Sequence, residues 1–206
     1  MTTLPGLTWS QRYRNGISWA LIAAFLFLLL FTTHSWARDS LIDLFFEAAG
    51  LVLIVVCTFG RLWASVYASG YKDEVVIESG PYAMVRNPLY LFSFIGVVGM
   101  GLVSENLLIL ALAPLVFLVY YPFVVRSEER FLLARFGAAY ADYLRRVPRF
   151  IPNWRLLREP EVYQVNVRVY RRSLLEATMF IWLYLAFHFI ERLQHMGVLP
   201  VLFRVP

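Results

Sequence analysis

The sequence predicts an all-α integral membrane protein with about five transmembrane helices and a cytoplasmic helical or loop segment after the fourth. The chain has 206 residues, of which 60% are hydrophobic. Its mean hydropathy of +0.61 lies far above that of an ordinary soluble domain. The apolar residues are gathered in blocks that approach the ~20 residues needed to cross a bilayer. The arginines, in contrast, are concentrated in one polar segment between two such blocks.

The apolar blocks give the order of the helices. The first two are predicted over residues 17–36 and 41–64, with a short polar turn between them. The first block is longer than the apolar core of a cleaved signal peptide, so we expect it to remain as a helix. A polar loop leads to a helical hairpin over residues 88–103 and 107–125, and the fifth helix is predicted over residues 174–190. We expect the whole chain, residues 1–206, to form a single membrane domain.

The basic residues predict the orientation of these helices, because cytoplasmic loops carry an excess of Lys and Arg. Eleven arginines lie in the polar segment after the fourth helix: Arg126, Arg130, Arg135, Arg145, Arg146, Arg149, Arg155, Arg158, Arg168, Arg171 and Arg172. We therefore expect this segment and the N-terminus to be cytoplasmic, with anionic membrane lipids as partners. Such a cluster beside membrane helices needs no nucleic acid to explain it. The absence of an Asn-x-Ser/Thr site favours a bacterial inner membrane.

The sequence offers no pattern typical of a metal site. Cys57 is the single cysteine and lies within an apolar block, where a small buried side chain is the expected role. The three histidines are widely separated along the chain. We expect neither a disulfide nor a metal centre within one chain.

A compact polar motif, Gly-Pro-Tyr-Ala-Met-Val-Arg-Asn-Pro-Leu-Tyr, occupies residues 80–90 where the third helix begins. Asn87 before Pro88 is typical of a helix N-cap followed by proline in the first turn. This directs the free N–H groups of the helix toward the cytoplasmic side, where they favour an anion. Arg86 adds a planar fork that suits a carboxylate or a phosphate. With its two tyrosines, the motif suits a zwitterionic, partly aromatic ligand.

Two adjacent carboxylates, Glu128 and Glu129, follow the fourth helix. The hairpin brings them close to the Arg86 motif, where either can accept hydrogen bonds from an ammonium group or from sugar hydroxyls. Neighbouring positions on a helix point apart, so we do not expect both to share one role. The alternative is a local ion pair with Arg126 or Arg130.

These motifs, with Phe-Gly-x-x-Tyr-x-x-Tyr at residues 136–143 and a proline-bounded lid segment, Val-Pro-Arg-Phe-Ile-Pro at residues 147–152, resemble a known family. They are similar to the membrane-embedded isoprenylcysteine carboxyl methyltransferases and the related phospholipid N-methyltransferases. The resemblance covers residues 65–152, which would form a catalytic core of cytoplasmic turn, helical hairpin and lid. Asn87 stands where the family signature, Arg-His-Pro-x-Tyr, has histidine, which removes any role that needs an imidazole.

The resemblance implies an S-adenosylmethionine site at the cytoplasmic end of the third and fourth helices. The implied catalytic residues are Arg86, Tyr90 and Glu129. The implied cofactor-binding residues are Gly80, Tyr82, Arg86, Asn87, Pro88, Tyr90, Glu128, Glu129 and Tyr140. The residues expected near the substrate are Tyr121, Tyr143 and Arg149.

The expected acceptor is lipophilic or lipid-modified. A carboxylate, as in an isoprenylcysteine, is already nucleophilic, whereas an amine needs a base that the motif does not supply. We therefore expect a carboxylate or an easily ionised thiol. The alternative is N-methylation of phosphatidylethanolamine. An alternative of another class is a membrane subunit without catalysis. The sequence does not select the acceptor or the oligomeric state.

Overall fold

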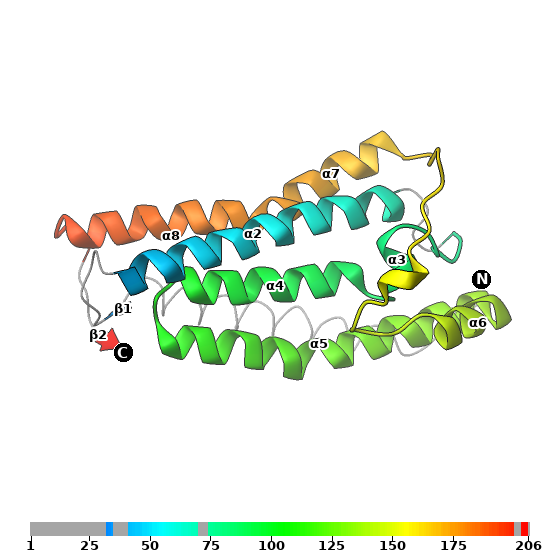
Figure 1. The fold of residues 1–206 in the computed structure, drawn as a ribbon, viewed down its shortest axis with the longest axis horizontal. Coiled ribbons are helices and arrows are strands. Elements are labelled where there is room, and N and C mark those ends of the chain that lie inside the picture. Colours follow the sequence, from blue (N-terminus) through cyan, green and yellow to red (C-terminus); the bar gives the residue numbers. More distant parts are fainter. Residues whose placement is uncertain (1–31, 35–40, 70–73, 200–202, 206) are drawn as a thin grey trace, which may run out of the picture.

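The computed structural model describes residues 32–34, 41–69, 74–199 and 203–205, and most of these residues are helical. The helices are α2 (Leu41–Ala68), α3 (Pro81–Met84), α4 (Pro88–Val103), α5 (Leu107–Phe136), α6 (Ala138–Arg146), the 3-10 turn η1 (Trp154–Leu156), α7 (Val167–Ala177) and α8 (Met179–His195). Figure 1 shows α2, α4, α5 and α8 as long rods that run side by side, with α3 and η1 at one end. We refer to this end as the α3 end.

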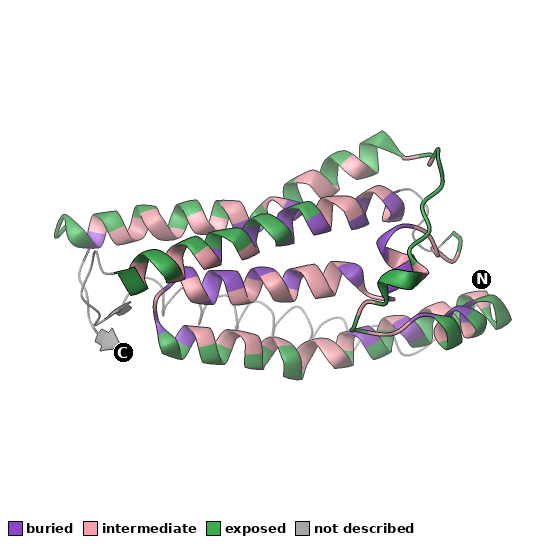
Figure 2. Cartoon of the chain, in the orientation of Figure 1, coloured by how far each residue is buried: buried purple, intermediate pink, exposed green. Residues whose placement is uncertain are grey.

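Three helical stretches of the described chain are long and apolar enough to cross a bilayer: Leu41–Ala68, Leu107–Phe136, and α7 with α8, Val167–His195. Helix α4 is apolar but has 16 residues, fewer than the ~20 needed to span. Large apolar side chains cover the outer faces of the long helices, as Phe59 and Phe123 do with 66% and 62% of their surface exposed. Figure 2 shows that many of the buried residues lie along α2 and α4. An apolar exterior around a close-packed centre is typical of a protein that faces lipid.

Most of the first predicted helix, residues 17–36, lies outside the described residues. Its part that is described, Thr32–His34, is not helical but forms strand β1, which pairs in parallel with strand β2 (Phe203–Val205). Thr32 and Thr33 are consecutive β-branched residues, which favour extended backbone over helix.

The hairpin begins as predicted, but its second helix ends later. Helix α4 has the predicted bounds, whereas α5 continues past residue 125 to Phe136. The predicted end marked the change from apolar to charged residues, and Glu and Arg are themselves good helix formers. Helix α5 stops only at Gly137, whose φ of 55° leaves the helical region.

The fifth predicted helix, residues 174–190, is longer at both ends and is broken once. Helix α7 begins at Val167, where the Asn166 side chain accepts hydrogen bonds from two backbone N–H groups of the first turn. It stops at Ala177, and α8 begins at Met179. The polar segment predicted over residues 126–173 is therefore helical at both of its ends.

Glycines bring α2 and α4 into backbone contact. A methyl group added at Gly50 would lie 2.7 Å from the Gly99 carbonyl oxygen, and one added at Gly99 would lie 2.9 Å from the Gly50 carbonyl oxygen. Small residues that allow close backbone approach are the usual way to pack membrane helices. Next to this contact, Ile54, Met100 and Phe180 form part of a buried apolar cluster that also joins α8 to the pair.

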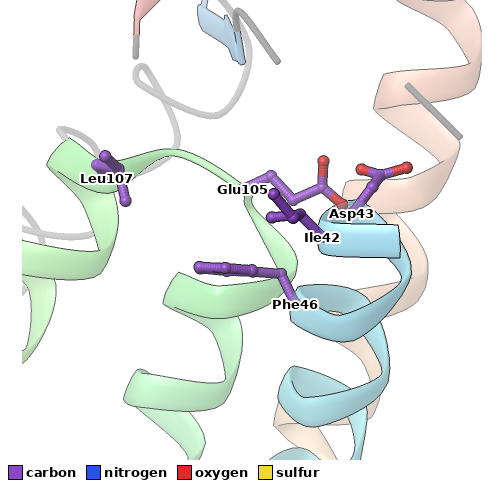
Figure 3. A pocket seen from close by; sticks show the side chains of 5 residues that line it. All are labelled: Ile42, Asp43, Phe46, Glu105 and Leu107. Carbon is purple, nitrogen blue, oxygen red and sulfur yellow. The ribbon is translucent and has the colours of Figure 1, made fainter. Parts of the chain in front are cut away.

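At the end of the bundle opposite α3, two carboxyl groups meet in a small pocket. Figure 3 shows Asp43 of α2 and Glu105 of the α4–α5 turn directed toward each other beside Phe46. Glu105 has a positive φ of 49°. Burial, together with a hydrogen bond and repulsion from Asp43, raises the pKa of Glu105 to about 9. The Glu105 carboxyl group is therefore expected to keep its proton at neutral pH.

This proton predicts a pH-dependent stability. The folded protein holds a proton on Glu105 that the unfolded chain, with an ordinary pKa of 4.5, releases. Because the folded state then binds more protons, the free energy of unfolding falls as the pH rises between these two pKa values. We expect Glu105→Gln to raise the thermal unfolding midpoint in detergent, relative to wild type, more at about pH 8 than at about pH 4. Glu161→Gln, at an exposed glutamate, serves as control. An equal difference at both pH values would contradict the assignment.

Candidate functional site

The turn at residues 80–88 is held in place by backbone hydrogen bonds to distant parts of the chain. The Gly80 N–H donates to the Arg158 carbonyl at 2.8 Å, and the Arg86 N–H donates to the Pro148 carbonyl at 2.9 Å. Gly80 has φ 59°, and a methyl group there would lie 2.2 Å from the Tyr67 ring, so glycine is required. The lid segment, residues 147–152, is thus fastened directly to the start of α4.

A buried carboxylate between two arginines forms the centre of the site. Glu129 of α5 is 6% exposed. Its Oε1 atom accepts hydrogen bonds from Arg86 Nη1 at 3.1 Å and from Arg149 Nε at 3.2 Å. Its Oε2 atom accepts from Arg149 Nη2 at 2.6 Å. Arg149 therefore binds the carboxylate through two hydrogen bonds, from Nε and Nη2, and this bidentate geometry is the strongest for an Arg–carboxylate pair.

The three charges do not cancel, since two guanidinium groups surround one carboxylate. The Nε atom of Arg86 is buried and has no hydrogen-bond partner among the residues that the structure describes. A buried donor without a partner is costly unless a ligand supplies the acceptor. Arg86 also stands at the start of α4, where helix N–H groups favour an anion. This corner of the site is therefore suited to a ligand carboxylate or phosphate.

The side chain of Asn87 does not cap α4, contrary to the prediction. Asn87 occupies the N-cap position and Pro88 follows in the first turn, but no side-chain hydrogen bond to the helix forms. Instead, Asn87 Nδ2 donates to the Arg149 carbonyl at 3.4 Å. The amide therefore joins the lid segment to the turn instead of capping α4.

Buried tyrosines of α3 and α6 belong to the same part of the structure. Tyr140 and Tyr143 are 5% and 3% exposed, and the Tyr143 hydroxyl donates to the Tyr82 carbonyl at 2.8 Å. Burial and the nearby Glu129 charge raise the pKa of Tyr140 to about 12. Burial, followed by the charge of Glu128, also raises the pKa of Tyr82. These phenols are therefore expected to stay protonated at neutral pH.

Two further predicted residues, Tyr90 and Tyr121, lie next to each other on neighbouring helices. The rings of Tyr90 on α4 and Tyr121 on α5 lie 5.1 Å apart, and Tyr121 stacks on Phe117 at 3.8 Å. Arg86 and Arg149 thus both contact Glu129, whereas Tyr90 and Tyr121 form a separate aromatic pair between α4 and α5.

An open cavity of about 740 Å³ lies beside Arg86, which is ample for a nucleoside-sized ligand. Of the predicted cofactor-binding residues, Arg86 alone lines it. The other lining residues belong to the lid segment and its neighbours: Leu144, Arg145, Arg146, Val147, Pro148, Ile151, Pro152, Asn153, Trp154 and Arg155. The prediction therefore missed Trp154, an exposed aromatic residue whose signal was only its place after the lid segment. In the described ranges, no group of three or more His, Cys, Asp or Glu residues is arranged to hold a metal ion.

Much of the chain is similar to known proteins. Residues 46–139 match the family described as phospholipid methyltransferase. The chain is 34% identical over 195 residues to the nickel-cobalt-cadmium resistance protein NccN of Alcaligenes xylosoxydans xylosoxydans, covering 95% of this chain and 91% of that protein. It is 32% identical to the cobalt-zinc-cadmium resistance protein CzcN of Cupriavidus metallidurans, covering 91% and 86%.

The chain is also similar, over a shorter stretch, to an enzyme. The chain is 33% identical over 94 residues to the protein-S-isoprenylcysteine O-methyltransferase of Schizosaccharomyces pombe, covering 45% of this chain and 40% of that enzyme. No solved structure shows significant similarity to the chain.

Proposed function

Because the chain belongs to the family of membrane methyltransferases that includes the phospholipid and isoprenylcysteine enzymes, we propose that it methylates a lipophilic acceptor with S-adenosylmethionine. The observation that carries this proposal is the Arg86–Glu129–Arg149 cluster at the start of α4, beside an open cavity. When bound, S-adenosylmethionine supplies an electrophilic methyl group on a sulfonium. Positioning is the main task that remains for the protein in such a displacement.

The residues of the site fit this molecule by charge. The unpartnered Nε of Arg86 and the N-terminal N–H groups of α4 would hold its carboxylate. Glu128 lies within electrostatic range of Tyr82 and Tyr140, and would accept hydrogen bonds from its ammonium group or ribose hydroxyls. The tyrosine faces would favour a cationic sulfur centre. Glu129 would act by fixing Arg86 and Arg149 rather than by touching the ligand.

The protonation of the tyrosines supports an acceptor that needs no base. Burial raises the pKa of Tyr82, Tyr140 and Tyr143, so none of these phenols is expected to take a proton at neutral pH. A carboxylate is nucleophilic without deprotonation, whereas an ammonium group must lose a proton first. We therefore favour a lipid-borne carboxylate over phosphatidylethanolamine, with an easily ionised thiol as second choice.

A transfer assay tests the proposal. The purified protein in lipid nanodiscs is incubated with S-adenosylmethionine that carries a tritiated methyl group. The acceptors are a farnesylated cysteine with a free carboxylate, its amide as matched control, phosphatidylethanolamine and a long-chain thiol. We expect base-labile label on the free carboxylate and none on the amide. Label on phosphatidylethanolamine alone would support the N-methylation alternative.

The alternative of another class is a membrane subunit without catalysis. It draws support from the names of NccN and CzcN, which mention no transfer reaction. It predicts no label on any acceptor from protein whose folding is confirmed by a cooperative thermal transition. We also propose that the α3 end faces the cytoplasm of a bacterial inner membrane, supported by the arginines of residues 126–172. A reporter fused after Arg158 tests this orientation, and its export would contradict it.

A further inference from the structure

Arg61 is a charged residue within the helical bundle that the methyltransferase motifs do not include. The sequence placed it near the end of the second helix, but α2 continues seven residues further, to Ala68. Its Nη1 atom donates to the Ser93 hydroxyl of α4, and its Nη2 atom donates to the Glu176 carbonyl of α7 at 3.2 Å. Both partners are uncharged. The Nε atom is buried and has no hydrogen-bond partner within the described ranges.

The guanidinium of Arg61 therefore lacks a carboxylate partner in the part of the chain that the structure describes. Charged side chains within a membrane bundle are costly and usually pair with an opposite charge or serve a function. An Arg fork has five N–H donors, and two neutral partners leave both its charge and its Nε unsatisfied. The missing partner is an oxyanion of the kind that a guanidinium binds side-on.

Arg61 borders the candidate site from the side of the bundle. Ser93 lies five residues after Pro88 on α4, which places it about 7.5 Å below the start of that helix. The charges of Glu128 and Arg61 both act on the Tyr82 hydroxyl, and Arg61 also acts on Tyr121. Arg61 thus lies below the level of Arg86, within electrostatic range of Tyr82 and Tyr121. Figure 1 shows α2 and α4 side by side at this level, with α7 next to α2.

We propose that Arg61 binds the anionic group of the lipid-borne acceptor and holds it below the cofactor site. This inference rests on the proposed function, and it assigns the substrate class as a lipid with an oxyanion, either a carboxylate or a phosphate. The two arginines then bind different ligands. Arg86 binds S-adenosylmethionine, which arrives from water, and Arg61 binds the acceptor, which arrives from the bilayer.

The test measures the binding of both ligands separately, without turnover. S-adenosylhomocysteine is titrated into the protein in nanodiscs, and so are a farnesylated cysteine carboxylate, its neutral methyl ester and, in a separate arm, a farnesyl phosphate. We expect Arg61→Gln to raise the Kd of an anionic probe at least about 10-fold. The Kd of S-adenosylhomocysteine and of the methyl ester should change less than about 2-fold. The arm that loses affinity identifies the carboxylate or the phosphate as the preferred group.

Ser93→Ala is the matched control, because it removes one hydrogen bond of Arg61 and leaves its charge. We expect this variant to keep the anionic probe within about 3-fold of wild type. If Arg61 only supported the helix break after α7, both variants would lower the thermal midpoint and neither would separate anionic from neutral probes. Equal affinity of wild type and Arg61→Gln for both anionic probes would overturn the proposal.

Two further results keep the inference distinct from the proposed function. If Arg61→Gln fails to fold, Arg61→Lys decides instead, since it keeps the charge but loses the planar fork. A fall of at least about 5-fold in affinity for the anionic probe supports the proposal, and unchanged affinity contradicts it. If wild-type protein binds an anionic probe through Arg61 but does not bind S-adenosylhomocysteine, the proposed function fails while the anion site stands.

Discussion

Glu129→Gln should lower kcat/KM for methyl transfer at least about 30-fold, because it removes the anion that holds two arginines in place. Glu129 is 6% exposed and accepts three hydrogen bonds from Arg86 and Arg149. The neutral amide keeps the shape of the side chain but leaves two guanidinium groups facing each other without a counter-charge. Breaking one partner out of a buried, hydrogen-bonded charge cluster costs about 2–5 kcal/mol. The measurement is the initial rate of tritiated-methyl transfer over a range of acceptor concentrations.

The neighbouring residue provides the control. Glu128→Gln removes the same charge one position earlier on α5, where the side chain is half-buried. We expect this variant to lose affinity for the cofactor but to keep the thermal unfolding midpoint of wild type. Glu129→Gln should lower both. Wild-type kinetics in Glu129→Gln would show that the cluster is not needed for activity.

Gly50→Leu should prevent stable folding, because no space exists for a side chain between α2 and α4. A Cβ atom at Gly50 would lie 2.7 Å from the Gly99 carbonyl oxygen and 2.9 Å from the Val103 backbone nitrogen. Backbone atoms of a helix cannot move aside as a flexible side chain can, so we expect a loss of at least about 3 kcal/mol. The free energy of unfolding in mixed detergent with increasing dodecyl sulfate gives the measurement.

The matched control enlarges a small residue that faces outward. Ala111 lies on the exposed face of α5, and Ala111→Leu adds similar volume to a membrane helix without a facing backbone. We expect its free energy of unfolding to stay within about 0.5 kcal/mol of wild type. If both variants lose the same stability, the contact between α2 and α4 is not the cause.

Local signals in the sequence were enough to predict α4 but not the ends of its neighbours. Pro88 in the first turn and the polar turn after Val103 define α4, and the structure has the predicted bounds. Helix α5 extends further, because the residues after Val125 change from apolar to charged but remain good helix formers. The start of α7 depends on the cap formed by Asn166, whose side chain accepts two hydrogen bonds from the first turn.

The residues of the candidate site could be predicted from the sequence, but not all of the contacts between them. The hairpin predicts that Arg86 and Glu129 approach each other, and the structure places them 3.1 Å apart. Arg149 was expected near the substrate, yet its fork lies on Glu129. That pair depends on α6 reversing the chain and returning the lid segment to the start of α4, which no local pattern encodes. Arg61 was assigned only to the end of a helix for the same reason, since its contacts come from α4 and α7.

The central claim is that the α3 end of the bundle binds S-adenosylmethionine through Arg86 and the start of α4. The most direct measurement is an equilibrium titration of S-adenosylhomocysteine into the purified wild-type protein, beside Arg86→Ala and Glu129→Gln. We predict saturable binding at one site for wild type, with Kd at least about 10-fold higher in both variants. Wild-type protein that unfolds cooperatively on heating but shows no binding would contradict the claim.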